Sequence, residues 1–281
     1  MLIRIIVGFG CGLFALGLTF LTGTPAFPAI FAVVSVWCEF ELLRCAGTLR
    51  RPLTAGASFL AAAAGPLAAG FAADGAFAGY ALPAAAVYLL IIAAAYTFSV
   101  GAGEKGKPRL TLEQSAVTGF FTLYLSLAFG GIVAICRTGE GRIIFPMIFI
   151  AAWCTDVFAY FSGYFFGKHK LIPLVSPKKT VEGAIGGTLI CTLIFVVYGL
   201  VAGVADGSDA LVNILLLALL GVLSSAVAQA GDLLMSALKR HYGIKDFGKS
   251  LPGHGGFLDR FDSVVAVSCV FYLFLTVFSV F

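Results

Sequence analysis

Long apolar stretches recur along the whole chain and constrain its fold more than any other feature. Nine of them match the roughly 20 residues that a helix needs to cross a bilayer core. They cover residues 2–21, 25–43, 52–73, 76–100, 114–136, 143–167, 183–205, 210–231 and 264–281. Only 11% of the 281 residues are charged, against 60% hydrophobic. This balance excludes a soluble enzyme, a disordered chain and a nucleic-acid-binding domain. We expect an all-α, polytopic integral membrane protein with about nine transmembrane helices.

The positions of the basic residues predict the orientation of these helices. We interpret the first stretch as a retained helix rather than a cleaved signal peptide, because a second apolar stretch follows at once and no cleavage site is evident. If the N-terminus is cytoplasmic, only Arg137 and Arg142 of the 18 Lys and Arg residues lie outside. Cytoplasmic loops are enriched in Lys and Arg. The sequence therefore predicts a cytoplasmic N-terminus and an external C-terminus.

The two halves of the chain differ in polarity. Residues 1–142 form nearly acid-free helices, to which we assign packing, lipid contact or dimer formation. Residues 143–281 carry polar residues in and beside the helices, and we expect the catalytic region here, with cytoplasmic loops at 168–182 and 234–263. No internal repeat is evident, so an inverted-repeat transporter has no support.

Two glycine motifs match nucleotide-binding patterns but lack the context that these patterns require. Residues 243–250 read G-x-x-x-x-G-K-S, yet an apolar helix precedes them and Leu251-Pro252-Gly253 follows. A P-loop instead joins a strand to a helix. Residues 101–106 read G-x-G-x-x-G without a βαβ unit around them. We reject both nucleotide-binding interpretations.

Asp156 lies inside the sixth apolar stretch. A carboxylate at that depth is costly unless it faces a cavity, a cation or a metal. Gly163 and Gly167 share its helical face and would let a backbone or a ligand approach closely. We favour a functional carboxylate, and the alternative is a structural one paired inside the bundle.

The segment that follows, Ser176 to Gly183, combines cations with a helix start. Ser176 or Thr180 can cap the next helix, and Glu182 suits its first turn. Lys178 and Lys179 lie beside that start, where phosphate groups bind readily. The alternative is an ordinary basic cytoplasmic loop.

A third polar group follows the eighth apolar stretch. If that helix continues to Arg240, then Asp232, Ser236, Lys239 and Arg240 line one face. Hard oxygen ligands among cations suggest Mg²⁺ bound together with a phosphorylated substrate. The alternative is a set of salt bridges at a helix end.

The residues after this helix continue the polar pattern. Asp259 and Asp262 share a face if the last helix begins near Leu258. His254 lies among Pro252, Gly253, Gly255 and Gly256, a combination that suggests close backbone approach to a ligand. For His254 itself a structural hydrogen-bonding role is as plausible as an acid–base role.

Residues 236–262 resemble the signature of the phosphatidate cytidylyltransferases, also called CDP-diacylglycerol synthases. The resemblance covers roughly residues 150–281 and rests on the pattern Ser236-x-Leu238-Lys239-Arg240-x4-Lys245-Asp246-x-Gly248-x2-Leu251-Pro252-x-His254-Gly255-Gly256-Phe257-x-Asp259-Arg260-Phe261-Asp262. It implies transfer of a cytidylyl group from CTP to phosphatidate in a bacterial plasma membrane, with one or two Mg²⁺ ions. It also implies an active site on the cytoplasmic side and, as an expectation, a homodimer.

The resemblance and the charges together imply roles for individual residues. Asp232 and Asp259 become the expected metal ligands. The expected catalytic residues are Lys239, Arg240, Lys245, Asp246, His254, Arg260 and Asp262. The expected substrate-binding residues are Asp156, Ser176, Lys178, Lys179, Thr180, Glu182, Ser236, Gly255 and Gly256.

Three other functions stay open at this point. An ion transporter or channel would use Asp156 in a cation path. A CTP-dependent lipid kinase, or a synthase that uses another lipid phosphate, would share the phosphate-binding residues. A membrane scaffold would tolerate substitution of the acidic residues.

Overall fold

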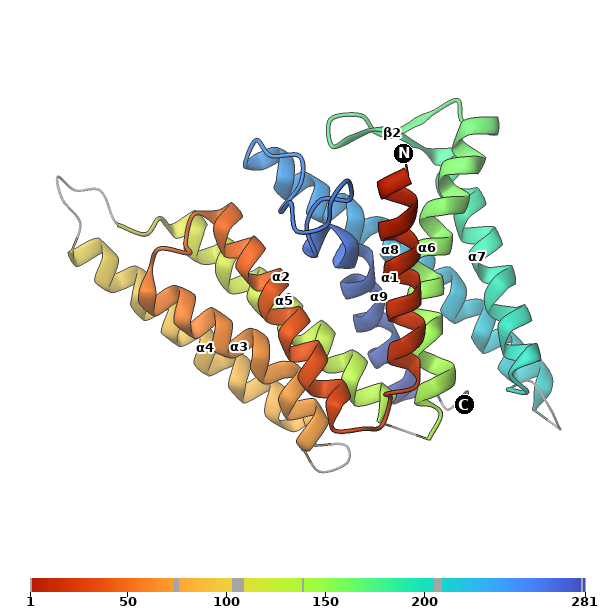
Figure 1. Cartoon of the computed structure of the whole chain (residues 1–281), viewed down its shortest axis with the longest axis horizontal. Helices are drawn as coiled ribbons and strands as arrows, with labels where there is room; N and C mark the ends of the chain where they lie inside the picture. The colour runs from red at the N-terminus through yellow and green to blue at the C-terminus, as the bar shows by residue number, and fades with distance from the viewer. Residues whose placement is uncertain are drawn as a thin grey trace. The chain divides into compact units, whose positions relative to one another are not determined.

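The computed structural model consists of helices connected by short loops (Figure 1). It describes residues 2–72, 76–102, 109–137, 139–204, 209–278 and 280, and side chains from residue 8 onward. Within these residues the helices are α1 (Leu2–Thr19), α2 (Ala26–Ala46), α3 (Pro52–Phe71), α4 (Phe77–Gly101), α5 (Leu112–Cys136), α6 (Gly141–Phe166), α7 (Val181–Val201), α8 (Ala210–His241) and α9 (Leu258–Val277).

These helices confirm the predicted polytopic membrane protein. Eight of them, α2 to α9, are long and apolar enough to cross a bilayer, and α1 is a shorter apolar helix when counted from Gly8. Each corresponds to one predicted stretch. The orientation of the termini stays a prediction. Most of the rejected glycine motif at 101–106 lies outside the described residues.

One feature departs from the all-helical prediction. Strands β1 (Lys170–Ile172) and β2 (Ser176–Thr180) form a small antiparallel hairpin in the predicted loop 168–182, with Lys170 opposite Thr180. Short pairings of this kind are not visible in a sequence whose dominant pattern is apolar. The hairpin matters because it carries several of the predicted substrate-binding residues.

Two helix ends lie outside the predicted apolar stretches. Helix α8 continues ten residues beyond 231, to His241, so Asp232 to Arg240 are helical, as the stripe interpretation required. It stops before Gly243, whose φ of 65° is a conformation that favours glycine. Helix α9 begins at Leu258 rather than at 264, which places Asp259 and Asp262 on it.

The chain divides into two compact units, and the predicted boundary at residue 142 stays a prediction. The first contains Met1–Gly8, Thr24–Ala134 and Ile244–Arg260, and the second contains Phe9–Gly23, Ile135–Gly243 and Phe261–Phe281. The loop 244–257, predicted as part of the catalytic region, therefore packs with the N-terminal helices. The roles assigned to the two predicted regions stay predictions.

The first unit is held together by apolar packing and small residues. Phe31 of α2 and Phe129 of α5 are fully buried, and their ring centroids lie 6.0 Å apart. Ser126 of α5 donates a hydrogen bond of 2.6 Å to the carbonyl of Ala61 in α3. A Cβ at Gly65 would collide with Ser126, so glycine permits this close crossing.

The second unit packs α7 between α6 and α8. Gly187 of α7 lies so close to α6 that a Cβ there would come within 2.9 Å of the Ala159 side chain. Thr155 of α6 shares a buried hydrogen bond of 2.9 Å with Ser225 of α8. Small residues and hydroxyl pairs therefore replace the hydrophobic effect as the source of helix association in the membrane.

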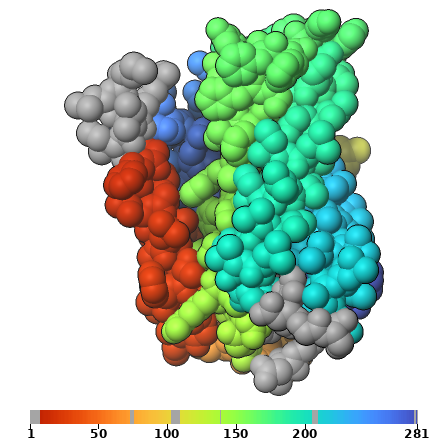
Figure 2. Space-filling view, turned by 90° about the vertical axis from the view of Figure 1, so that its right-hand side faces the viewer, coloured from red at the N-terminus to blue at the C-terminus, as the bar shows by residue number. Residues whose placement is uncertain are grey.

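The outer face of α7 is apolar. Leu189, Leu193 and Val197 are exposed at intervals of four residues, which places them on one side of the helix. Figure 2 looks onto this unit, with α7 in turquoise. In a chain whose other helices are apolar as well, such a stripe is suited to contact with lipid.

Candidate active site

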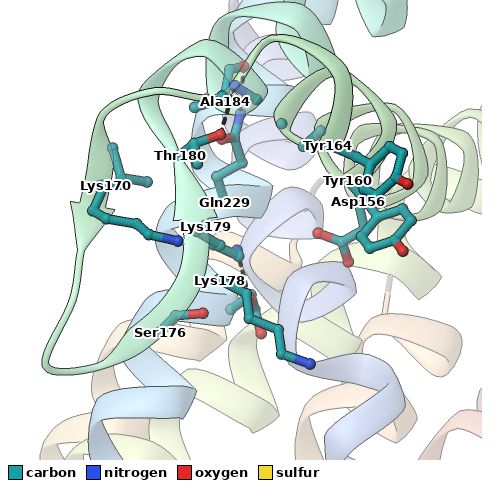
Figure 3. A pocket seen from close by; sticks show the side chains of 16 residues that line it. Asp156, Tyr160, Tyr164, Lys170, Ser176, Lys178, Lys179, Thr180, Ala184 and Gln229 are labelled. Carbon is teal, nitrogen blue, oxygen red and sulfur yellow. Dashed lines mark hydrogen bonds and ion pairs between the residues drawn. The ribbon is translucent and has the colours of Figure 1, made fainter.

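A cavity of about 570 Å³ lies in the second unit, between α6, the hairpin, α7 and α8. Figure 3 shows the lysines of the hairpin on one side and Asp156, Tyr160 and Tyr164 of α6 on the other. Six predicted residues line it, and they are Asp156, Ser176, Lys178, Lys179, Thr180 and Asp232. The tertiary structure thus brings together residues that lie up to 76 positions apart in the sequence.

The hairpin is anchored at the start of α7. The side-chain oxygen of Thr180 accepts a hydrogen bond of 3.1 Å from the backbone N–H of Gly183, so Thr180, one of the two predicted candidates, caps α7. Gly163 of α6 and Gly167, the residue after its end, lie against Thr180, where a Cβ would collide with it. The cap places two lysines of β2 beside the positive end of a helix, an arrangement suited to binding phosphate.

Lysines and aspartates that are distant in the sequence form ion pairs in this unit. Lys179 of β2 forms an ion pair with Asp232 of α8. The Lys239 amine lies 4.0 Å from the Asp262 carboxylate, and these two side chains are only 9% and 11% exposed. Asp156 and Asp232 both line the cavity, so their carboxylates repel one another when both are ionised. A cation brought to the aspartates would relieve this repulsion.

The aspartates suit magnesium only together with a phosphorylated ligand. Among the described residues no group of three or more His, Cys, Asp or Glu side chains is placed to hold a metal ion. Magnesium usually keeps several water molecules and takes one or two carboxylates plus substrate phosphates. Asp232 and Asp262 supply oxygen donors of this kind, so the residues present fit the ion on these terms.

The loop 244–257 belongs to the first unit and forms a compact turn. The N–H of His254 donates to the carbonyl of Leu251 over 2.9 Å, around Pro252 and Gly253, whose φ is 78°. This is the geometry of a Pro-Gly turn. Residues 243–250 follow helix α8 and lead into the turn at 251–254, so they do not join a strand to a helix as a P-loop does.

Asp259, at the start of α9, organises this loop. Its Oδ2 atom accepts hydrogen bonds from the backbone N–H groups of Phe247 (2.8 Å) and Gly256 (2.9 Å). A Cβ at Gly255 would lie 2.9 Å from the same oxygen, and the Gly255 φ of 85° also favours glycine. The structure thus adds a structural role to Asp259. Its role as a metal ligand stays a prediction.

Three residues of α2 that the sequence analysis overlooked bind the same loop. Glu41 accepts hydrogen bonds from the Ser250 hydroxyl (2.7 Å) and from the Leu258 N–H (2.9 Å). Arg44 donates to the carbonyl of Phe247 over 2.6 Å, and Trp37 donates to Ser250 over 3.2 Å. The available signal was an acidic residue inside an apolar stretch, which marks a buried polar contact.

A protein-family comparison places these features in a known context. The model of the cytidylyltransferase family matches residues 2–278. The chain belongs to this family. The match extends through the N-terminal helices, beyond the part of the sequence that carries the resemblance noted above.

Individual relatives within the family match shorter segments. The phosphatidate cytidylyltransferase of Staphylococcus haemolyticus is 42% identical over 161 residues, which is 57% of this chain and 59% of that protein. The Bacillus subtilis enzyme of the same name is 36% identical over 197 residues, 69% of this chain and 68% of that protein. The Staphylococcus aureus (strain COL) enzyme is 48% identical over 128 residues, 46% of this chain and 47% of that protein.

Several predicted residues of this family member are not among those that line the cavity. Glu182 accepts from the backbone N–H groups of Lys168 and His169, and its carboxylate lies 2.6 Å from the His169 ring nitrogen. It holds the base of the hairpin, a role that the sequence did not indicate. Four others are exposed, namely Arg240, Lys245, Asp246 and Arg260, and Ser236 is half-buried.

His254 is half-buried in the first unit. Its Nδ1 atom is buried and has no hydrogen-bond partner among the described residues. A buried ring nitrogen of this kind is costly to leave unsatisfied. The catalytic role predicted for His254 is untested.

Proposed function

We propose that the chain transfers a cytidylyl group from CTP to phosphatidate, giving CDP-diacylglycerol and pyrophosphate. The observation that carries the proposal is a phosphate-suited cavity among membrane-spanning helices, lined by Lys178, Lys179 and Asp232. The relatives named phosphatidate cytidylyltransferase support the choice of substrates. A lipid phosphate can reach such a cavity from the bilayer, and CTP can reach it from water.

In the proposed reaction a phosphate oxygen of phosphatidate attacks the α-phosphorus of CTP. The bond from the α-phosphorus to the bridging oxygen breaks, and pyrophosphate leaves with that oxygen. The attacking phosphate is already largely ionised at neutral pH, so no strong general base is needed. The main obstacle is repulsion between two polyanions, which Lys178 and Lys179 would reduce.

The proposed reaction uses magnesium, as one or two bound Mg²⁺ ions. Asp232 and Asp262 would hold the ion, with Asp259 as the further predicted ligand. When bound, the ion would neutralise charge on the phosphates of CTP and on the pyrophosphate. The lysines paired with the two aspartates would then be available to the phosphates. Positioning and charge neutralisation would supply most of the rate.

The proposed setting is a bacterial plasma membrane, with the active site facing the cytoplasm, where CTP is found. The distribution of Lys and Arg supports this orientation. A homodimer stays an expectation from the family resemblance.

The test uses detergent-purified protein with CTP, phosphatidate and Mg²⁺, and follows CDP-diacylglycerol and pyrophosphate together. Equal release of both products, lost when the metal is omitted, is the expected result. Release of CDP with a newly phosphorylated lipid would instead identify a lipid kinase. A folded protein without any turnover of CTP would contradict the proposal and make ion flux the next assay.

A further inference from the structure

The carboxylate of Glu41 is the centre of the contact between α2 and the loop 244–257. It is only 1% exposed, and both of its oxygens are engaged, one by the Ser250 hydroxyl and one by the Leu258 N–H. The Ser250 hydroxyl in turn accepts from the indole N–H of Trp37, one helical turn before Glu41. The carboxylate therefore joins the end of the loop to the first residue of α9.

Two glycines of the loop leave the space that this carboxylate occupies. A Cβ at Gly248 or at Gly256 would collide with the Glu41 carboxylate oxygens. The absence of these two side chains lets the loop backbone close over a buried acid. Glycine at both positions therefore has a specific physical reason here, which is the volume of the Glu41 carboxylate.

The contact also restrains the residues that the sequence assigned to catalysis. Gly256 donates its N–H to Asp259, and Leu258 donates to Glu41, so the two carboxylates hold neighbouring backbone groups. His254 and Gly255 lie in the turn just before these anchored positions. Movement of the Glu41 contact would therefore change the conformation of this turn.

We infer that Glu41 is a positioning residue, which fixes the loop 244–257 in the conformation that the reaction requires. The inference rests on the proposed function for its effect on catalysis, but its structural part can be tested separately. Glu41 acts through the loop backbone rather than through contact with a substrate. The N-terminal helices would thus take part in catalysis and not only in packing.

The test compares Glu41→Ala, Glu41→Gln and a matched control, Glu39→Gln. Glu39 is a fully buried acid in the same helix, but it accepts from Thr122 of α5 rather than from the loop. Loss of hydrogen bonds to a buried charge corresponds to roughly 10- to 100-fold in an equilibrium or rate. We expect Glu41→Ala to lower kcat by about this factor at saturating CTP, with a smaller change in KM.

The conservative variant separates positioning from general stability. Glutamine keeps a carbonyl oxygen for the Leu258 N–H and an amide N–H for the Ser250 oxygen. We expect the kcat of Glu41→Gln to be close to that of the original chain, well above the kcat of Glu41→Ala. We expect the kcat of Glu39→Gln to stay within about twofold of that of the original chain. Equal losses in Glu41→Ala and Glu39→Gln would overturn the inference, as would an unchanged kcat in Glu41→Ala.

Limited proteolysis provides a reading that does not depend on activity. Lys245 and Lys249 are exposed in the loop, so mass spectrometry can follow tryptic cleavage after each. We expect faster cleavage in Glu41→Ala but not in Glu39→Gln. Unchanged cleavage in Glu41→Ala would overturn the inference. If the original chain does not turn over CTP, the proposed function fails, whereas this cleavage still decides whether Glu41 holds the loop.

Discussion

At the scale of single residues, the aspartates that the sequence grouped together have different surroundings. Asp232 lines a cavity and pairs with Lys179, so in the proposed reaction it would be available to a metal ion if that lysine moved to a phosphate. Asp259 is 5% exposed and uses one oxygen to hold two backbone N–H groups. The same substitution at these positions should therefore have different consequences.

Asp232→Asn should abolish turnover and leave the fold intact. Removal of one electrostatic group that stabilises the transition state typically lowers kcat by about 100-fold or more. Turnover measured beside the thermal unfolding midpoint in detergent checks this. Normal Mg²⁺-dependent activity in Asp232→Asn would contradict its assignment as a metal ligand.

Asp259→Asn should loosen the loop as well as impair turnover. An amide oxygen is a weaker acceptor than a carboxylate for the N–H groups of Phe247 and Gly256. We expect faster tryptic cleavage after Lys249 in Asp259→Asn and unchanged cleavage in Asp232→Asn. Slow cleavage in both variants would show that Asp259 does not restrain the loop.

At the scale of elements, the hairpin and α7 act together. Thr180 ends β2 and caps α7, so one side chain sets where the lysines lie relative to the helix start. Glu182 holds the base of the hairpin through His169 and two backbone N–H groups. The phosphate-suited arrangement thus depends on the cap as much as on the lysines.

Thr180→Ala should reduce the free energy of unfolding by about 1 kcal/mol, the usual effect of losing a side-chain cap. Thr180→Ser keeps the hydroxyl and is the matched control. The thermal unfolding midpoint in detergent measures both variants. A midpoint for Thr180→Ala equal to that of Thr180→Ser would show that the cap contributes nothing.

At the scale of the whole molecule, each polar loop of a membrane protein lies on one side of the bilayer. The loops after α6 and α8 carry most of the cations of the second half of the chain. Moving this many Lys and Arg residues across a bilayer is strongly disfavoured. Both loops should therefore face the cytoplasm.

Trypsin added to sealed membranes tests this orientation. In inverted vesicles, we expect cleavage after the exposed residues Lys245 and Lys249. In right-side-out spheroplasts, we expect cleavage only near Arg137 and Arg142, on the opposite side. Cleavage after Lys249 in intact spheroplasts would reverse the predicted topology.

The fold class and six of the sixteen residues that line the cavity could be predicted from the sequence alone. Apolar length predicts membrane helices because a bilayer leaves no other way to satisfy the backbone. Helical spacing showed which polar residues would share a face if α8 continued to Arg240 and α9 began near Leu258, and the structure meets both conditions. Local chemistry offered Ser176 or Thr180 as the cap of α7, and the structure selects Thr180.

Which charged side chains pair with one another depends on how the helices pack. The Lys179–Asp232 pair and the contact of Glu41 with Ser250 join positions 53 and 209 residues apart, and no local pattern encodes such a separation. The use of Asp259 as a backbone acceptor likewise depends on how the loop 244–257 folds back. Carboxylates in an apolar bundle must find partners, but the partner is whichever group the packing of helices brings within reach.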